Sequence, residues 1–221
     1  MCGRFALHHP AGEITARFGI EQVALELSPR FNIAPSQPVA IIRQRQHRTL
    51  EECKWGLVPV WAKDPAIGNR LINARAETLS EKPAYRAAFR YRRCLIPASG
   101  FYEWKKEGKN RIPTYIYLKE SPPFALAGLW EEWRTPEGDL LPTCTIVTTQ
   151  ANPFMAPIHS RMPLILAPDQ EPLWLDPQVQ DPARLAPLLQ PYPPEEMAAH
   201  PVSRQVNTAT FDNPACILPV A

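Results

Sequence analysis

Hydrophobic and polar positions alternate along the middle of the chain, and this period of two predicts a series of β-strands. The clearest segments are Arg93–Ala98, Phe101–Lys105, Thr114–Leu118, Phe124–Trp130, Thr143–Thr149 and Met162–Leu166. The turn-forming sequence Glu107-Gly108-Lys109-Asn110 separates the second segment from the third, so these two strands are expected to form a hairpin. Further towards the N-terminus, Pro38–Ile42 and Leu50–Val58 are predicted to be strands that flank a basic tip.

The remaining segments favour short helices. Pro10–Phe18 places Ile14 and Phe18 four residues apart on one apolar side, which is the spacing of a helix. Glu81–Arg93 is predicted to be a basic helix. After Ala167 the chain becomes rich in proline, and short helices are expected around Glu171–Leu175 and Pro182–Leu189.

The order of these elements predicts the fold class. Most strands follow one another through short connections, and neither an internal repeat nor a domain boundary interrupts them. The sequence therefore predicts one α+β domain over residues 1–221, with an antiparallel, barrel-like β core and peripheral short helices.

Composition restricts the class of protein. Hydrophobic residues make up 45% of the chain and charged residues 21%, which is typical of a soluble globular protein. No apolar run approaches the roughly 20 residues that span a bilayer, and no secretory signal is visible. The five cysteines lie far apart without a Cys-x-x-Cys pair, so neither a disulfide framework nor a zinc site is expected. We expect a cytoplasmic protein, nucleoid-associated if bacterial, that has no metal, cofactor or membrane contact and is a monomer.

Charge is distributed unevenly along the chain. Residues 1–120 contain 20 Lys and Arg against 11 Asp and Glu, a net charge of +9, whereas residues 121–221 contain 4 against 11, a net charge of −7. This asymmetry indicates a basic face and a polyanionic partner. The alternative is that the two halves fold together and their charges intermingle.

Cys2 is the most distinctive candidate for chemistry, because it directly follows Met1. Removal of Met1 would leave one residue with both a free α-amine and a thiol, whose reference pKa values are about 7.7–8.0 and about 8.5. Such a 1,2-aminothiol can condense with an aldehyde and close to a five-membered thiazolidine, or the amine can act as a base for the thiol. The alternative is that Cys2 is simply a small second residue.

Three further polar residues lie within apolar or aromatic segments. Glu103 is flanked by Tyr102 and Trp104, an environment that would raise its carboxyl pKa and suit it to proton transfer. His159 titrates near neutrality, and Asn73 can orient a ligand by hydrogen bonding. A solvent-facing glutamate, a structural histidine and a turn-forming asparagine are the respective alternatives.

Four motifs occur in a specific order along the chain: Met1-Cys2-Gly3-Arg4-Phe5, Asn73-Ala74-Arg75-Ala76-Glu77, Gly100-Phe101-Tyr102-Glu103-Trp104 and His159-Ser160-Arg161-Met162-Pro163. Together they resemble the SRAP (SOS response-associated peptidase) family over essentially the whole chain. The resemblance implies the SRAP fold and the capture of abasic sites in single-stranded DNA. It also implies that Cys2 forms a thiazolidine with the ring-opened sugar, that Asn73, Glu103 and His159 complete the active site, and that a lyase-like activity and a self-cleaving peptidase that releases the residue before Cys2 accompany capture.

DNA binding requires cations for phosphates and flat apolar surfaces for unpaired bases. Arg4 and Arg75 are the first candidates for phosphate contacts, since they lie beside the proposed chemistry in sequence. Arg161 follows them because it is close to His159. Arg86 and Arg90 are weaker candidates, since a solvated helix face explains them as well, and Trp61 is a candidate for base stacking, with a place in the core as the alternative. The remaining DNA-contact candidates are Gly3, Asn32 and Pro35. Replication-fork proteins are further candidate partners.

Two other functions remain open. Glutamine amidotransferases with an N-terminal cysteine also begin Met-Cys-Gly, but they need an Asn-Gly oxyanion element, and no Asn-Gly dipeptide occurs in this sequence. A non-catalytic reader of modified DNA would bind without a covalent bond.

Overall fold

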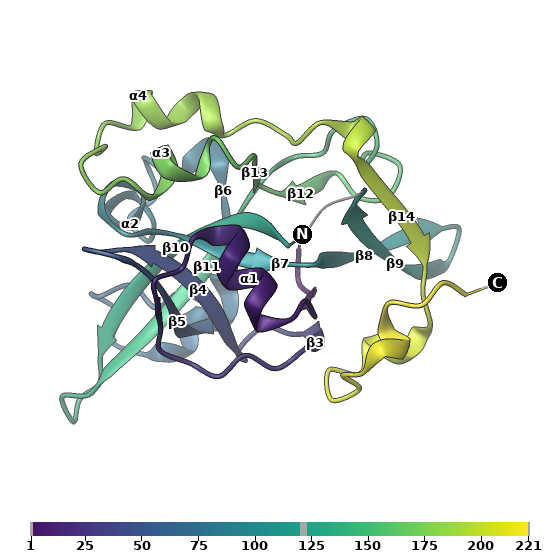
Figure 1. Ribbon diagram of the computed structural model, residues 1–221, viewed down its shortest axis with the longest axis horizontal. Helices are drawn as coiled ribbons and strands as arrows, with labels where there is room; N and C mark the ends of the chain where they lie inside the picture. Colours follow the sequence, from purple (N-terminus) through teal and green to yellow (C-terminus); the bar gives the residue numbers. More distant parts are fainter. Residues whose placement is uncertain (1, 120–122, 221) are drawn as a thin grey trace.

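Five strands close into a barrel in the computed structural model, which describes residues 2–119 and 123–220 (Figure 1). Their order is β11 (Leu140–Gln150), β10 (Phe124–Arg134), β7 (Arg93–Ala98), β4 (Pro38–Gln44) and β5 (Arg48–Trp55). A parallel pairing of β5 with β11, in which Cys144 lies opposite Trp55, closes the barrel. The predicted antiparallel, barrel-like core is therefore confirmed, with one parallel seam.

Short strands extend the barrel sheet. β2 (Gln22–Val23) pairs with β5, β12 (Arg161–Pro163) and β6 (Asn73–Arg75) pair with β11, and β13 (Ile165–Leu166) pairs with β10. β6 and β12 each pair with the second half of β11, so the motifs that contain Asn73 and Arg161 meet at this strand.

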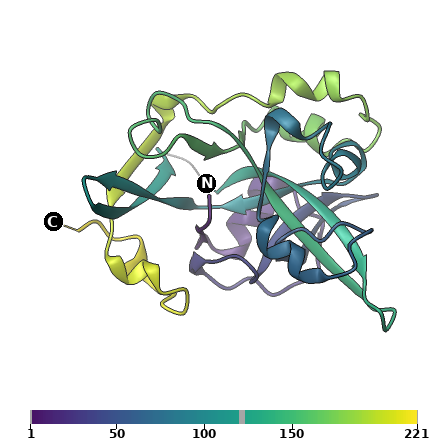
Figure 2. The ribbon, with the colours of Figure 1, turned by 180° about the vertical axis from the view of Figure 1, so that it is seen from behind.

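A second, five-stranded sheet lies beside the barrel, and both views show it projecting to one side (Figures 1 and 2). Its order is β14 (Met197–Pro201), β9 (Asn110–Leu118), β8 (Gly100–Glu107), β1 (Phe5–Leu7) and β3 (Arg30–Ile33). Gly100 begins β8 at a close approach, since a Cβ there would lie 2.3 Å from the Tyr115 ring. Alternation along β8 sends Phe101 into the main core, whereas Tyr102 packs into a smaller cluster with the C-terminal segment.

Helices are short and peripheral, as expected. The α-helices are α1 (Ala11–Phe18), α2 (Arg86–Tyr91), α3 (Glu171–Leu175) and α4 (Pro182–Leu185). The 3₁₀ helices are Pro65–Arg70, Ala76–Thr78, Ala186–Leu188, Pro194–Glu196, Arg204–Asn207 and Pro214–Cys216. Within the described residues, no helix combines the length and apolar character that a bilayer crossing demands.

Several predicted elements differ in length from those observed. The basic helix begins at Arg86 and not at Glu81, because Pro83 disfavours helical backbone at the residue before it. The strand predicted to reach Val58 ends at Trp55, where Gly56 turns the chain with a φ of 135°. Pro163 and Pro187 interrupt the last strand and the last helix, since proline has no N–H to donate. By contrast, α1 buries Ile14 and Phe18 as predicted.

The charges of the two halves are partly combined. Arg17, Arg30 and Arg92 of the basic half form ion pairs with Glu171, Asp212 and Glu131 of the acidic half, at 2.6, 2.5 and 2.7 Å. The sequence-level asymmetry therefore overstates the basic surface, because these pairs hold elements together and neutralise part of the excess.

Arg93 is a buried cation that joins the helical cover to the barrel. Its guanidinium donates to the carbonyl oxygens of Phe89, Arg90, Trp174, Asp176 and Val179, at 2.6–2.8 Å. Burial lowers its pKa to about 10, so it stays protonated at neutral pH.

We predict that Arg93→Met lowers the free energy of unfolding by about 3–5 kcal/mol, because several buried carbonyls lose a charged donor at once. Chemical denaturation followed by circular dichroism measures this change. The control Arg90→Met alters an exposed residue of α2 and should change stability by less than about 0.5 kcal/mol. Equal stability of the two variants would contradict this role of Arg93.

Candidate functional site

Cys2 lies at the junction of the two sheets, where Asn73 holds it. The side-chain Nδ2 of Asn73 donates to the Cys2 carbonyl oxygen at 2.8 Å. Asn73 is the first residue of β6, in register with Ile146 of β11, and the Tyr85 hydroxyl donates to its carbonyl at 3.1 Å. β11 and Tyr85, which are distant from each other in sequence, therefore fix this amide against Cys2.

The other amide atom of Asn73 is available to a ligand. Its Oδ1 is buried and accepts no hydrogen bond from any residue in the described part of the chain. Because a buried acceptor is costly when left unsatisfied, the site is suited to a donor such as an amine or a sugar hydroxyl.

Glu103 is 3% exposed and lies on β8, where its side chain shares the inward face with Phe101. Burial raises its carboxyl pKa above the ordinary value, and the nearby His159 opposes the shift. The expected desolvation of this glutamate is therefore present, and the two residues are close enough to interact electrostatically.

His159 follows a turn after β11 and is half-buried. Its own backbone N–H donates to the Met155 carbonyl at 2.9 Å, and its Nδ1 lies 3.0 Å from the backbone nitrogen of Arg161, which donates to it. When Nδ1 accepts in this way, a proton on the neutral ring resides on Nε2. Nδ1 also lies 3.1 Å from the Arg161 carbonyl oxygen, to which it would donate in the other tautomer, so the Arg161 backbone holds the ring in place in either form.

The Cys2 thiol is fully buried. Burial, followed by the negative charge of Glu103, raises its pKa well above the ordinary range, and Sγ lies 3.9 Å from the Arg4 carbonyl oxygen. The thiol is therefore protonated at neutral pH in this arrangement, without even the small thiolate fraction that the reference pKa of about 8.5 would allow. Chemistry that begins with the α-amine and uses the thiol afterwards fits this environment better than attack by a preformed thiolate.

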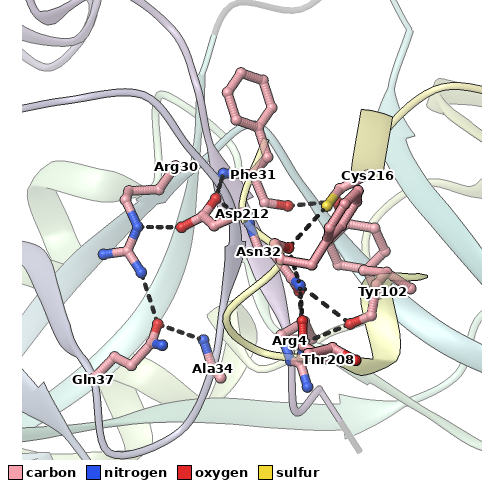
Figure 3. Close-up of polar contacts among 12 residues, drawn as sticks. Arg4, Arg30, Phe31, Asn32, Ala34, Gln37, Tyr102, Thr208, Asp212 and Cys216 are labelled. Atoms are coloured by element: carbon pink, nitrogen blue, oxygen red, sulfur yellow. Dashed lines mark hydrogen bonds and ion pairs between the residues drawn. The ribbon is translucent and has the colours of Figure 1, made fainter. Parts of the chain in front are cut away.

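Arg4 and Asn32 belong to a network that fastens the C-terminal segment to β1 and β3 (Figure 3). Nη1 of Arg4 donates to Asn32 Oδ1 at 2.6 Å and to the Val206 carbonyl at 2.7 Å. Asp212 accepts from the backbone N–H groups of Phe31 and Asn32, at 2.6 and 3.0 Å. Asn32 is fully buried, so its predicted contact with DNA would require this segment to move, and its position indicates a bracing role.

A groove of about 600 Å³ leads to Asn73. It is lined by Trp61, Leu71, Asn73, Arg75, Thr78, Lys82, Pro83, Ala84 and Tyr85. Trp61 is 57% exposed and Arg75 is also exposed, so an aromatic face and a cation border the same hollow. Lys82 was missed at the sequence level because its segment was assigned to a helix, whereas the chain there is a turn.

The remaining DNA-contact candidates lie in different environments. Both terminal nitrogens of Arg161 bind the Glu77 carboxylate, at 2.6 and 3.0 Å, and one also donates to the Thr148 carbonyl. This pairing favours a role for Arg161 in holding β12 beside β6. Arg86 and Arg90 are exposed on α2, outside the residues that line the groove, and Gly3 and Pro35 are half-buried.

Known proteins resemble this chain in both sequence and structure. The family model SOS response associated peptidase (SRAP) matches residues 1–209. The abasic site processing protein YoqW of Bacillus subtilis is 48% identical over 221 residues, which cover 98% of this chain and 99% of the relative. The abasic site processing protein YedK of Escherichia coli is 31% identical over 100% of both chains.

The fold is also found in a solved structure. The crystal structure of a Bacteroides thetaiotaomicron protein superposes with a TM-score of 0.91 at 28% identity, covering 100% of both chains. The match of sequence over nearly the whole length and of fold over all of it leads to one conclusion: this chain belongs to the SOS response associated peptidase (SRAP) family.

Proposed function

We propose that this protein processes abasic sites by capturing them on Cys2 as a covalent thiazolidine cross-link in single-stranded DNA. The observation that carries the proposal is the Asn73 amide on the Cys2 carbonyl, beside a buried Glu103 that interacts with His159, with Asn73 itself lining an open groove. The names of the relatives YoqW and YedK support abasic-site processing as the class of activity. Capture shields the lesion during replication.

The chemistry begins with the sugar. An abasic deoxyribose is mainly a closed hemiacetal, and opening it requires one proton to leave the hydroxyl and one to reach the ring oxygen. Because burial raises the pKa of Glu103, this residue keeps its proton to a higher pH than an exposed glutamate and can return it, and His159 can serve as the second proton carrier.

Two bonds to the same carbon complete the cross-link. After Met1 is removed, the α-amine of Cys2 attacks the aldehyde carbon, and the carbinolamine loses one water with acid assistance to give an imine. The thiol then adds to the imine carbon, and its proton passes to the nitrogen. The net reaction is aldehyde plus aminothiol to thiazolidine plus water. The Asn73 hydrogen bond restricts rotation of Cys2, so both nucleophiles face the same carbon.

The same site can account for the peptidase activity in the family name. Release of the residue before Cys2 requires a nucleophile, a proton donor for the leaving amine and an oriented carbonyl. We propose that the Cys2 thiol attacks the Met1 carbonyl carbon, that Glu103 protonates the leaving Cys2 amine as the C–N bond breaks, and that water then hydrolyses the thioester to release Met1 and restore the thiol. Autoprocessing and capture would thus use the same residues in succession. An ordinary methionine aminopeptidase would produce the same mature N-terminus.

The two rival functions make different demands on the site. An amidotransferase needs a clamp for the glutamine carboxylate, whereas the cations at the groove, Arg75 and Lys82, stand beside an exposed tryptophan in an arrangement suited to a nucleotide chain. A non-catalytic reader would not require a buried glutamate, which carries an energetic penalty in the folded protein.

We predict that Cys2→Ser converts a durable adduct into a labile one. The serine amine still forms an imine, but a hydroxyl closes the ring less favourably than a thiol. Denaturing gels of abasic oligonucleotide complexes, with and without borohydride, measure the difference. Wild-type adducts should survive without reductant, and the variant should need it. A form with Met1 retained is the control and should react slowly, and rapid reaction of that form would contradict the role of the amine.

Glu103→Gln should slow cross-linking by about 10²–10⁴-fold, the usual contribution of a general acid–base group, with non-covalent DNA affinity nearly unchanged. Whereas the substitution lowers the cross-linking rate, it should maintain or raise the free energy of unfolding. Because the folded pKa of Glu103 is raised, the folded protein binds the extra proton, and wild-type stability falls as pH rises from about 4.5 through the elevated value. The variant should not lose stability over this pH range, and at a pH above the raised pKa of Glu103 it should be at least as stable as the wild type. Cross-linking rates and chemical denaturation at several pH values check these two expectations. A variant that cross-links as fast as the wild type would assign Glu103 a structural role.

Arg75→Ala should weaken binding to intact and abasic single strands alike and reduce the log–log salt slope by about 0.7, the value for one phosphate contact. Fluorescence anisotropy at several salt concentrations measures both quantities. Arg90→Ala is the matched control, since Arg90 is exposed on α2 outside the groove. The same slope for both variants would show that net charge, and not the groove, governs binding.

A further inference from the structure

Glu77 belongs to the same motif as Asn73, yet the proposed chemistry does not use it. It lies on the 3₁₀ helix Ala76–Thr78, which directly follows β6. Its carboxylate accepts from both terminal nitrogens of Arg161, at 2.6 and 3.0 Å. These hydrogen bonds lower the pKa of the Glu77 carboxyl below its ordinary value, so the carboxylate is charged at neutral pH. A two-point contact between charged groups fixes the direction of the guanidinium as well as its distance.

The backbone of Arg161 is what the His159 ring contacts. Nδ1 of His159 lies 3.0 Å from the Arg161 backbone nitrogen and 3.1 Å from the Arg161 carbonyl oxygen. One of these atoms is a donor and the other an acceptor, so the ring keeps a partner whichever of its nitrogens carries the proton. A displacement of the Arg161 backbone would therefore displace the imidazole.

Regular secondary structure holds this backbone on one side only. β12 begins at Arg161 and has three residues, and the chain before it, including His159, is irregular. The Arg161 side chain therefore supplies much of the anchoring at the start of β12. Besides binding Glu77, its Nη2 donates to the Thr148 carbonyl oxygen at 2.7 Å. Thr148 is itself in register with β6, so both contacts tie the start of β12 to the motif that contains Asn73.

We propose that Glu77 is a positioning residue for cross-linking, which acts through Arg161 to keep the His159 imidazole within reach of the substrate. The proposal rests on the proposed function, because His159 is a proton carrier in that scheme. Asn73 fixes Cys2 and Glu77 fixes Arg161, so one motif sets the position of both the nucleophile and the imidazole. Proton transfer requires donor and acceptor atoms about 2.6–3.2 Å apart, and small displacements therefore slow it. Glu77 itself takes no part in the bond-forming steps.

The test compares two substitutions of the same chemistry. Glu77→Gln removes the charge and keeps the shape of the side chain. Glu107→Gln is the matched control, because Glu107 also forms an ion pair, with Lys105 at 2.7 Å, on the hairpin of β8 and β9. Arg161→Met, alone and combined with Glu77→Gln, completes a double-mutant cycle.

Four quantities are measured for each variant. They are the cross-linking rate on a saturating abasic single-stranded oligonucleotide, the affinity for the undamaged oligonucleotide, the melting temperature and the NMR chemical shift of the His159 imidazole without DNA. The His159 resonance is identified by its loss in His159→Gln. Because the Glu77 side chain is 41% exposed, Glu77→Gln should lower the melting temperature by no more than about 4 °C.

Glu77→Gln should lower the saturated rate by about 10-fold, less than the roughly 10²-fold that a misplacement of about 1 Å can cost. Its affinity for the undamaged oligonucleotide should be unchanged. The His159 resonance should move in Glu77→Gln and stay in place in Glu107→Gln, which should keep the wild-type rate. In the Arg161→Met background, Glu77→Gln should cause no further loss of rate, because its effect passes through Arg161.

Three results would overturn the proposal: an unmoved His159 resonance, an unchanged saturated rate while the wild type cross-links, or losses of rate that add in the double variant. A moved resonance in Glu77→Gln, with a wild type that never cross-links, would retain the link from Glu77 to His159 and reject the proposed function.

Discussion

Burial of the Glu103 carboxyl beside Cys2 and His159 is the constraint on which the site depends. A carboxyl group that is 3% exposed is disfavoured as an anion, so burial raises its pKa above the ordinary value of a glutamate. The same charge raises the pKa of the Cys2 thiol. The charge states of these groups therefore depend on one another, which suits the proposed reaction, because it must open a hemiacetal, expel water and close a ring.

Strand alternation explains how β8 can serve this site and the C-terminal segment together. Glu103 points to the main core and the chemistry, whereas Tyr102 and Trp104 point to the opposite face. On that face, Asn32 donates to three carbonyl oxygens of the C-terminal segment, at residues 206, 208 and 211. The segment after β14 therefore braces the strand that leads out of Cys2, although it is distant from Cys2 in sequence.

Much of the fold could be predicted from sequence because its strands are local patterns. Phe124–Trp130 and Arg93–Ala98 were recognisable from their apolar content, and Gly108 marked the hairpin. The parallel closure of β5 on β11 could not be predicted, since pairing between residues 89 positions apart leaves no local signal. Proline positions decided the ends of several elements, and a period of apolar residues alone could not show them.

The site was predictable in its members but not in its geometry. Cys2 stood out by its position after Met1, and Asn73 and Glu103 stood out as polar residues in apolar context, yet only the fold shows that Asn73 contacts the Cys2 backbone. For two other residues, contacts and position in the fold decide what the sequence left open. Arg161 looked like a phosphate ligand and is bound to Glu77, whereas Lys82 looked like part of a helix face and lines the groove.

The most direct test of the account is the intact mass of the purified protein before and after incubation with a single-stranded abasic oligonucleotide. We predict a mature protein that lacks Met1 and a cross-linked product that is stable without reductant. The mass of this product should be the sum of the protein and oligonucleotide masses less one water. Peptide mapping should place the added mass on Cys2. An unmodified protein, or an adduct on any other residue, would contradict it.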